Sequence, residues 1–479
     1  MINKIPRIVC FIYCISLCPF IAPLYSGNLE NKLPYIEEYQ LDNGMRVLIS
    51  HNYDNPVVYV NVNINAGKLL DDPVNQPNLS QKAFYYIVSG TSKYPSIDYI
   101  RDKLFSIGSD DGSFKRFHIN NFHGEIEDYF LKKDLNEGLE LISEVLIHPT
   151  YPIFFQDFLK SIVFRFSPKA SLIRNRGLIR SHSLHQYANI YSHIHPKVSS
   201  KYGKKDLIKW HDNQFRPENI TIMIVGDVNA IYVKKLVKKY FGGWKSAEHI
   251  SEKREYLISL TDKSGIKLRF INVEDNKDAL ISIMQRAPGM NDEWIHAGIL
   301  AHSAFADRGF SSRLSNIHSK FNFYGYLISN LIRYPRLPYV EIRGEVQYKE
   351  LSRLYYEIQA EFNNLSNNSI TQIELDRLKT IKLNDYNNSL YDPERFSNFI
   401  QNNYNFNGYS LEKISNKWAQ INSVTLEEIN NAASKIFDAD NLMMVVIGNK
   451  DSCATFLEQF ENVEYYEQAE ELRESASSP

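Results

Sequence analysis

Hydrophobic and polar positions alternate in two stretches of this chain, and the second stretch repeats the arrangement of the first. Each stretch holds two runs of alternating apolar residues with an Asp-Asn pair between them. Such runs predict two strands joined by a short turn. The Asp-Asn pairs begin at Asp54 and Asp275, which are 221 residues apart. The predicted strands lie at residues 45–50, 58–64, 266–271 and 279–283.

A second match has almost the same spacing. Residues 219–226 and 441–448 are continuous apolar runs that each end in Gly, and they stand 222 residues apart. Runs of this kind are typical of buried strands. Two matches in the same order predict an internal duplication. We therefore expect an α+β chain of two homologous domains, each a mostly antiparallel sheet flanked by helices.

Helical patterns fill the chain between these strands. Apolar residues spaced three or four apart predict helices over residues 136–147, 351–365 and 373–390. Thr425 and Glu428 have the spacing of a capping box and predict the start of another helix. The expected organisation is a signal peptide at 1–26, a first domain at 34–245, a linker at 246–265, a second domain at 266–463 and a flexible acidic tail at 464–479.

The first 26 residues have the pattern of a secretory signal. Lys4 and Arg7 precede an uncharged stretch over residues 8–25, and the small residues Ser26 and Gly27 follow. This order predicts export, with cleavage near Ser26, and an uncleaved anchor is the alternative. Three of the four cysteines lie in the signal, so the mature chain keeps only Cys453 and cannot form an internal disulfide. A bacterial periplasm is the expected location, with no stable membrane anchor after cleavage.

The composition and the motifs that are missing argue against several classes of function for this chain. Hydrophobic residues make up 43% of the chain and charged residues 23%, and the formal net charge is −2. These values are ordinary for a globular protein, and they argue against nucleic acid as a main partner. No phosphate-binding glycine loop and no G-x-S-x-G segment is present, so the sequence gives no support for a nucleotide-binding enzyme or a serine hydrolase.

Several short segments resemble the M16 metallopeptidase family, which includes insulinase, pitrilysin and the mitochondrial processing peptidase. They occur in the family's order across nearly the whole mature chain. The segments are Leu41–Val47, Gly90–Pro95, Arg216–Asn219, Phe241–Trp244 and Arg308–Leu314. The resemblance implies two M16-type domains, a zinc site in the first domain, and a clam-like pairing of subunits around a peptide.

The resemblance fails at the residues that carry the chemistry. The family's zinc helix has an H-x-x-E-H motif, and here Gln81, Phe84 and Tyr85 stand at the His, Glu and His positions. The family's remaining ligand is a Glu further along, where this chain offers only Asp157. Zinc needs imidazole or carboxylate ligands and a carboxylate base to use its water. We therefore predict no metal, no cofactor and no catalytic residue in this chain.

One expected substrate contact remains in the second domain. Two family residues that hold the scissile carbonyl, an Arg and a Tyr, fall on Ser319 and Tyr326, so only the Tyr is kept. His318 or Lys320 could replace the missing Arg. The resemblance thus implies an inactive subunit that binds peptide or unfolded polypeptide. Its partner would be an active M16 homologue in a heterodimer, or a second copy of itself.

Two other functions stay open from the sequence. The chain could be a stand-alone peptide-binding or scaffold protein. It could also be a residual metalloendopeptidase with a substitute site, for which the candidates are His182, His185, His193 and His195. The alternative is that these histidines have no functional role and belong to a surface helix and its loop. His118 and His123 lie in an alternating stretch and are expected to be exposed strand residues.

Overall fold

The structure of the protein is a computed structural model. It describes residues 33–51, 56–71, 78–152, 170–188, 202–246, 264–289, 291–307, 312–321, 326–334, 337–406 and 408–467. The predicted signal at 1–26 and most of the predicted linker lie outside these residues. None of the helices in the described ranges is both long and apolar enough to span a bilayer.

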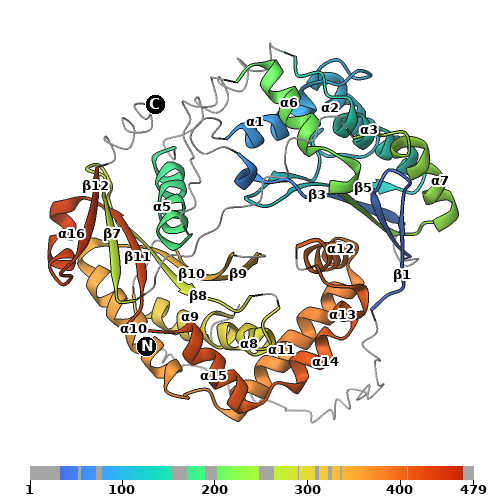
Figure 1. Cartoon of the computed structure of the whole chain (residues 1–479). Coiled ribbons are helices and arrows are strands. Elements are labelled where there is room, and N and C mark those ends of the chain that lie inside the picture. The colour runs from blue at the N-terminus through green and yellow to red at the C-terminus, as the bar shows by residue number, and fades with distance from the viewer. Residues whose placement is uncertain are drawn as a thin grey trace, which may run out of the picture. The chain divides into compact units, whose positions relative to one another are not determined.

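Two six-stranded sheets form the centre of the fold, one from each half of the chain (Figure 1). The first has the order β1-β2-β6-β3-β5-β4 and the second β12-β7-β11-β8-β10-β9. The first contains β1 (Ile36–Gln40), β2 (Arg46–His51), β3 (Val57–Ile64), β4 (Arg116–Ile119), β5 (Gly124–Leu131) and β6 (Ile220–Gly226). The second contains β7 (Lys267–Asn272), β8 (Ala279–Arg286), β9 (Leu327–Tyr334), β10 (Leu337–Val346), β11 (Met443–Gly448) and β12 (Val463–Glu467).

The two sheets repeat one topology over five strands. The strand pairs β2–β6 and β7–β11 are parallel, and the next three ladders in each sheet are antiparallel. The expected fold class is confirmed, with two mostly antiparallel sheets flanked by helices. The sheets differ at their first edge, where β1 runs antiparallel and β12 parallel to its neighbour. Because β12 includes residues 464–467, the predicted flexible tail began too early.

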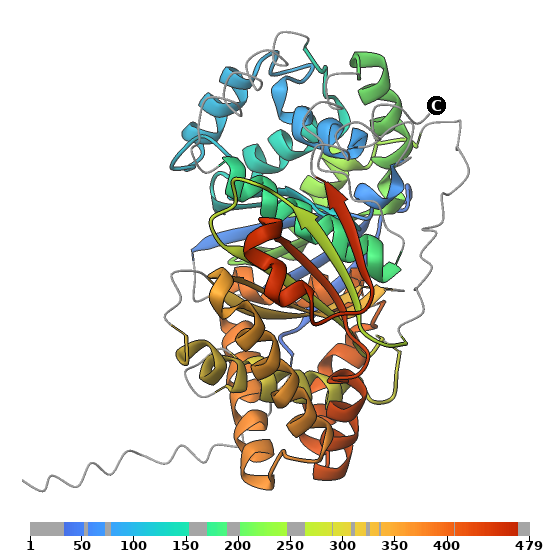
Figure 2. The same cartoon turned by 90° about the vertical axis from the view of Figure 1, so that its left-hand side faces the viewer.

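Helices cover both sheets (Figures 1 and 2). The first half has α1 (Leu79–Tyr86), α2 (Ile97–Ser106), α3 (Leu135–Ile147), α5 (Ala170–Ala188), α6 (Lys204–Gln214) and α7 (Ala230–Phe241). The second has α8 (Ile295–Ala306), α9 (Arg313–Ser319), α10 (Leu351–Ser366), α11 (Gln372–Tyr391), α12 (Pro393–Gln401), the π-helical turn η6 (Asn402–Phe406), α13 (Leu411–Ser415), α14 (Lys417–Ser423), α15 (Leu426–Ile436) and α16 (Lys450–Leu457). The helices expected at 136–147, 351–365 and 373–390 are confirmed as α3, α10 and α11, and Thr425 caps α15 in a capping box with Glu428.

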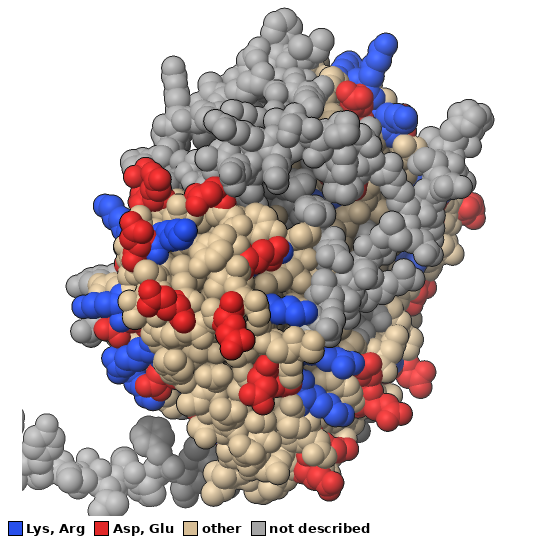
Figure 3. All heavy atoms as spheres, turned by 60° about the vertical axis from the view of Figure 1, so that its left-hand side comes forward, with Lys and Arg blue, Asp and Glu red and all other residues tan. Residues whose placement is uncertain are grey.

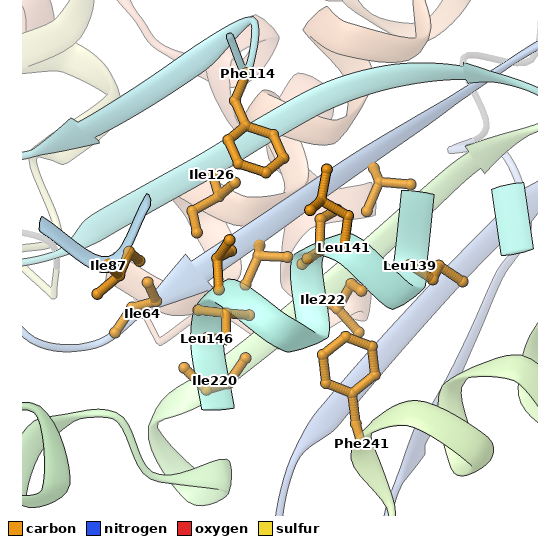
Figure 4. Close-up of a cluster of buried hydrophobic side chains, with 14 of the residues drawn as sticks. Ile64, Ile87, Phe114, Ile126, Leu139, Leu141, Leu146, Ile220, Ile222 and Phe241 are labelled. Carbon is orange, nitrogen blue, oxygen red and sulfur yellow. The ribbon is translucent and has the colours of Figure 1, made fainter. Parts of the chain in front are cut away.

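The central strands are apolar on both faces, as the continuous runs predict. In β6, Ile222 and Ile224 point into one core and Met223 and Val225 into another. The first of these cores is shown in Figure 4, where Ile222 lies near Leu139 of α3 and Phe241 of α7. Each sheet therefore needs a cover on its second face as well.

The second face of the first sheet is covered by the other half of the chain. Phe396 and Ile400 of α12 pack against Met223 and Val225 in one buried cluster. Polar contacts join the same surfaces: the Asn61 amide donates to Asn398 Oδ1 at 2.9 Å. In η6, just after α12, Asn405 Oδ1 accepts from Thr221 Oγ1 at 2.8 Å.

The second sheet receives a helix from the first half in return. Tyr187 of α5 is fully buried in a cluster that includes Met284 and Met443, and its hydroxyl donates to the Pro338 carbonyl at 2.8 Å. Ile179 of α5 packs among residues of β7, β8 and β11. Figure 2 shows α5, in green, against these strands. Residues 392–410, which stand 222 positions after α5, contain α12, so the two covering helices occupy equivalent places in the sequence.

This exchange predicts the effect of shortening an α12 side chain. The Ile400→Ala change should lower the free energy of unfolding by about 2–5 kcal/mol, because Ile400 is fully buried between the halves. The matched control is Ile231→Ala, at a side chain that is 80% exposed, and it should change stability by less than about 0.5 kcal/mol. Urea unfolding followed by circular dichroism measures both. Equal midpoints for the two variants would contradict the packing described.

Candidate functional site

Helix α1 carries the three positions that resemble the family's zinc motif. The chain enters α1 through Asn78, whose φ of 61° is left-handed, a conformation that Asn tolerates. The Asp71 carboxylate accepts hydrogen bonds from the Ser80 backbone amide and hydroxyl, at 2.9 Å and 2.6 Å. These bonds satisfy donors at the start of a helix that is only eight residues long.

Phe84 is part of the hydrophobic core of the first half. Its ring is fully buried and stacks on Phe117 of β4, with centroids 4.6 Å apart and planes at 23°. It also lies against Gly124, where an added Cβ would come within 2.5 Å of the Phe84 ring. Phe84, the residue predicted to stand at the position of the family's catalytic Glu, thus has an aromatic ring for which the neighbouring strand leaves room.

Tyr85 and Gln81 flank this ring. Tyr85 is half-buried and meets Phe117 edge-on at 5.8 Å. Burial raises the pKa of its phenol, and a hydrogen bond from the Ile119 backbone lowers it in part. Gln81 is partly exposed on the same helix. A neutral phenol and an amide are not the imidazole, thiolate or carboxylate groups that hold zinc in proteins.

The residues present in α1 therefore do not fit zinc. In the parts of the chain that the structure describes, no three His, Cys, Asp or Glu side chains converge as a metal site. Asp157, the remaining carboxylate weighed as a ligand, lies outside the described residues. That Gln81, Phe84 and Tyr85 correspond to the family's ligand positions stays a prediction from the sequence.

The segments that resemble the family meet in the fold as structural contacts. The Asn43 amide donates to the carbonyls of Phe241 and Trp244, at 2.8 and 3.0 Å. Gly44 has a φ of +92°, and a Cβ there would lie 3.2 Å from Glu218. Three segments that are separated in the sequence therefore contact one another at one corner of the first sheet. These contacts involve no metal, which explains why the scaffold can persist without a zinc site.

Tyr326 lies just before β9 and contacts the first half of the chain. The Arg176 guanidinium of α5 is 4.5 Å from the centre of its ring. Burial raises the pKa of Tyr326, while Arg343 and Arg176 lower it. Among the described residues, no hydrogen bond, ion pair or ring contact joins Tyr326 to α1. Its role as a substrate contact stays a prediction.

Ser319, which stands at the position of the missing Arg, and Lys320, which was weighed as a replacement, have structural contacts of their own. Lys320 forms an ion pair with Glu357 of α10 at 2.6 Å, and both side chains are partly exposed. The Ser319 hydroxyl donates to the Asn316 carbonyl at 2.8 Å within its own helix. These contacts assign both residues to the α9–α10 surface.

The histidine cluster is only partly described. His182 and His185 lie on α5, whereas His193 and His195 are outside the described residues. Arg269 donates to His185 Nδ1 at 2.9 Å, and the ring of His182 meets Tyr466 at 5.3 Å. A nitrogen that accepts from a guanidinium is not free for a metal, so these contacts favour a structural role for His185.

His123 is not the exposed strand residue that the alternating pattern predicted. It lies in the turn before β5, is 4% exposed, and has its Nε2 2.7 Å from Glu125 Oε1. Burial lowers the pKa of His123, while the contact with Glu125 raises it. His118 is exposed on β4, as expected.

Sequence reasoning also missed a buried polar network between β3 and β5. Glu127 is fully buried, and its carboxylate accepts from the Tyr59 hydroxyl at 2.5 Å and the Asn61 amide at 3.2 Å. Burial raises the pKa of Glu127 despite these hydrogen bonds and nearby Arg116. The alternation of residues along these strands predicts the face of the sheet on which Glu127 lies. It does not predict which side chains form hydrogen bonds with its carboxylate.

Comparison with known proteins identifies the family of this fold. Residues 201–382 match the model described as "Peptidase M16 inactive domain". This match covers less than half of the chain. The resemblance drawn from the sequence is therefore confirmed, and residues 81–85 do not contain an H-x-x-E-H motif.

Solved structures share the M16-type fold over most of the chain. A protease from Helicobacter pylori matches with a TM-score of 0.74 at 15% identity, covering 87% of this chain and 100% of that one. A peptidase M16 inactive domain from Pseudomonas fluorescens matches with a TM-score of 0.72 at 16% identity, covering 87% and 98%. The periplasmic protease PqqL from Escherichia coli matches with a TM-score of 0.67 at 16% identity, covering 93% of this chain and 51% of that one.

A relative in sequence is the zinc protease PqqE of Helicobacter pylori. The two are 23% identical in an alignment of 203 residues that covers 39% of this chain and 42% of that protein. The M16-type chain thus matches less than half the length of this relative. At these identities the structural matches establish the fold alone.

The packing of Phe84 predicts the cost of returning a carboxylate to α1. The Phe84→Glu change should lower the free energy of unfolding by more than about 4 kcal/mol, because it buries an unpaired charge. The control is Tyr99→Glu on α2, where the side chain is 60% exposed and the change should be below about 0.5 kcal/mol. Urea unfolding compares the two, and equal stability would mean that Phe84 is not a core residue.

Proposed function

We propose that this M16-type chain is a catalytically inactive subunit that binds peptide and pairs with an active zinc peptidase homologue. The observation that carries the proposal is the contrast within α1. Its surroundings form the hydrogen bonds and ring contacts of a folded scaffold, while Phe84, which is predicted to stand at the place of the catalytic carboxylate, is a buried core residue. Without a zinc-bound water and a carboxylate base, peptide hydrolysis by this chain alone has no source of nucleophile.

Peptide binding does not need the missing groups. An extended peptide can add to a sheet through backbone hydrogen bonds, with side chains held in alternate pockets. The strands β4 and β9 are the last strands at equivalent edges of the two sheets, and no described strand pairs with their outer sides. These edges support the proposal that the chain selects or positions peptides.

Export to a bacterial periplasm belongs to the same proposal. The basic and apolar pattern of residues 1–26 supports it. The printed description of the PqqL structure as a periplasmic protease is compatible with it. A heterodimer in that compartment would place this chain beside a homologue that carries the zinc.

Affinity purification of the tagged mature chain from its own cells tests the partner. We expect an M16 homologue with an intact H-x-x-E-H motif to be recovered in near-equal amount, as measured by mass spectrometry. The pair should hydrolyse a quenched fluorescent peptide, and this chain alone should be slower by at least about 10³-fold, since all members of the catalytic unit are absent.

The control for this experiment is the homologue with the Glu of its motif changed to Gln, which should remove the activity of the pair. Recovery of the chain without any homologue, but with retained peptide binding, would favour the stand-alone binding protein. Hydrolysis that persists with the inactivated homologue would contradict the proposal and require a substitute catalytic site in this chain.

A further inference from the structure

Three basic side chains in the second half of the chain lie near enough to one another for their charges to interact. They are Arg333 of β9, Lys417 of α14 and His296 of α8, and together we call them the cationic cluster. Helix α8 lies against β9, where His302 Nε2 is 3.0 Å from Ser329 Oγ. It also contacts α14. The fold thus joins positions that are separated by up to 121 residues in the sequence.

Of the three side chains, Arg333 has the fewest polar partners to offset its positive charge. Its guanidinium takes part in no hydrogen bond or ion pair among the described residues, and its side chain is partly buried. Burial lowers the pKa of Arg333, and Tyr409 is the one group that raises it. A guanidinium carries five N–H donors in a rigid plane, so an unpaired one in a partly buried site is costly.

Lys417 and His296 add to the same positive region. Lys417 Nζ donates to Asn403 Oδ1 at 3.0 Å and lies 5.1 Å from the centre of the Phe399 ring. Burial and the charge of Arg333 lower the pKa of Lys417 to about 7. His296 Nδ1 is buried without a hydrogen-bond partner, and burial lowers the pKa of this imidazole to about 4.

The absence of a carboxylate sets this cluster apart from other basic groups. Arg313 in the same half pairs with both Glu361 and Glu374, at 2.8 and 2.9 Å. On the face drawn in Figure 3, acidic and basic side chains are interspersed. By contrast, the described residues provide no acidic partner for Arg333 or Lys417, and Lys413 adds a further positive charge near His296.

An oxyanion would satisfy each of these groups. A carboxylate or phosphate accepts two parallel bonds from a guanidinium and a further bond from an ammonium. Arg333 is also the second-last residue of β9, whose outer side pairs with no other described strand. An extended peptide added along β9 would therefore bring one of its side chains beside the cluster.

We propose that the cationic cluster binds an oxyanion, and that its occupant is an acidic side chain of a peptide paired with β9. The peptide part rests on the proposed function. A free phosphate has the same chemistry and is the alternative source. The cluster would thus give this chain a preference for acidic residues at one position of its peptide.

The surroundings of Lys417 predict a pH dependence of binding. The groups that face it are Arg333 from β9, His296 from α8, Asn403 from η6 and Phe399 from α12, and none of them is an acid. A bound anion stabilises the charged ammonium and raises its pKa. Binding should therefore be tightest below pH 7 and weaken by up to about tenfold for each pH unit above it.

Two dye-labelled decapeptides that differ only in a central Glu or Gln test the site, with fluorescence anisotropy as the measurement. For the wild-type chain we expect about tenfold tighter binding of the Glu peptide, since a charge-assisted pair contributes on this scale. In Arg333→Gln this ratio should fall to about one. In the control Arg395→Gln, at an exposed position on α12, the ratio should not change.

Inorganic phosphate separates the two sources of the anion. Phosphate should raise the melting temperature of the wild-type and Arg395→Gln chains but not of Arg333→Gln. If neither peptide binds but phosphate acts in this way, the oxyanion site stands and the peptide function fails. Equal affinity for both peptides, together with no effect of phosphate, overturns the inference.

The melting temperatures of the variants show whether a loss of binding reflects a loss of folding. Removing an unpaired buried charge should leave the melting temperature of the empty Arg333→Gln chain equal or higher. Lys417→Gln provides a second variant, in which the preference for the Glu peptide should shrink and its dependence on pH above 7 should disappear. A preference that survives in both variants would also contradict the site.

Discussion

The exchange of helices between the two halves is the constraint on which the rest of this structure depends. Each sheet is built from strands that are apolar on both faces, and its own half covers only one of them. The second faces are covered by α12 and α5, each supplied by the opposite half. Burial of apolar surface is the dominant favourable term in folding, and it does not depend on a bound metal. A chain held together in this way can keep its architecture without zinc ligands, which α1 is predicted to have lost.

The sequence predicts the parts of this fold that depend on local pattern. The runs at 219–226 and 441–448 are the buried central strands β6 and β11, and the capping box at Thr425 starts α15. The exchange of α5 and α12 could not be predicted, because a helix pattern does not say which sheet it will cover. For the same reason the burial of His123 and the Tyr59–Glu127 contact were missed, since their partners come from other segments. The tail prediction failed because β12 gains its stability from β7, almost 200 residues earlier.

In the candidate site, too, the sequence predicts features that depend on neighbouring residues but not contacts between segments that are far apart in the chain. The identity of residues 81–85 is enough to exclude an H-x-x-E-H motif there, so the sequence alone predicts the loss of the ligands. What replaced them could not, because the packing of Phe84 depends on Phe117 and on the small residue Gly124 in other strands. The cationic cluster is more distant still, as its members come from β9, α8 and α14. Both regions support one account, in which a peptidase scaffold has kept its sheet edges and lost the means to cleave.

The zinc content of the purified mature chain tests this account most directly. The chain would be incubated with excess Zn²⁺, passed through a desalting column and analysed by mass spectrometry of the metal. The account predicts less than about 0.1 zinc per chain, because a protein zinc site binds near-stoichiometrically and α1 offers no ligands for one. A value near one zinc per chain would contradict it, and would mean that residues other than Gln81, Phe84 and Tyr85 form a metal site in this protein.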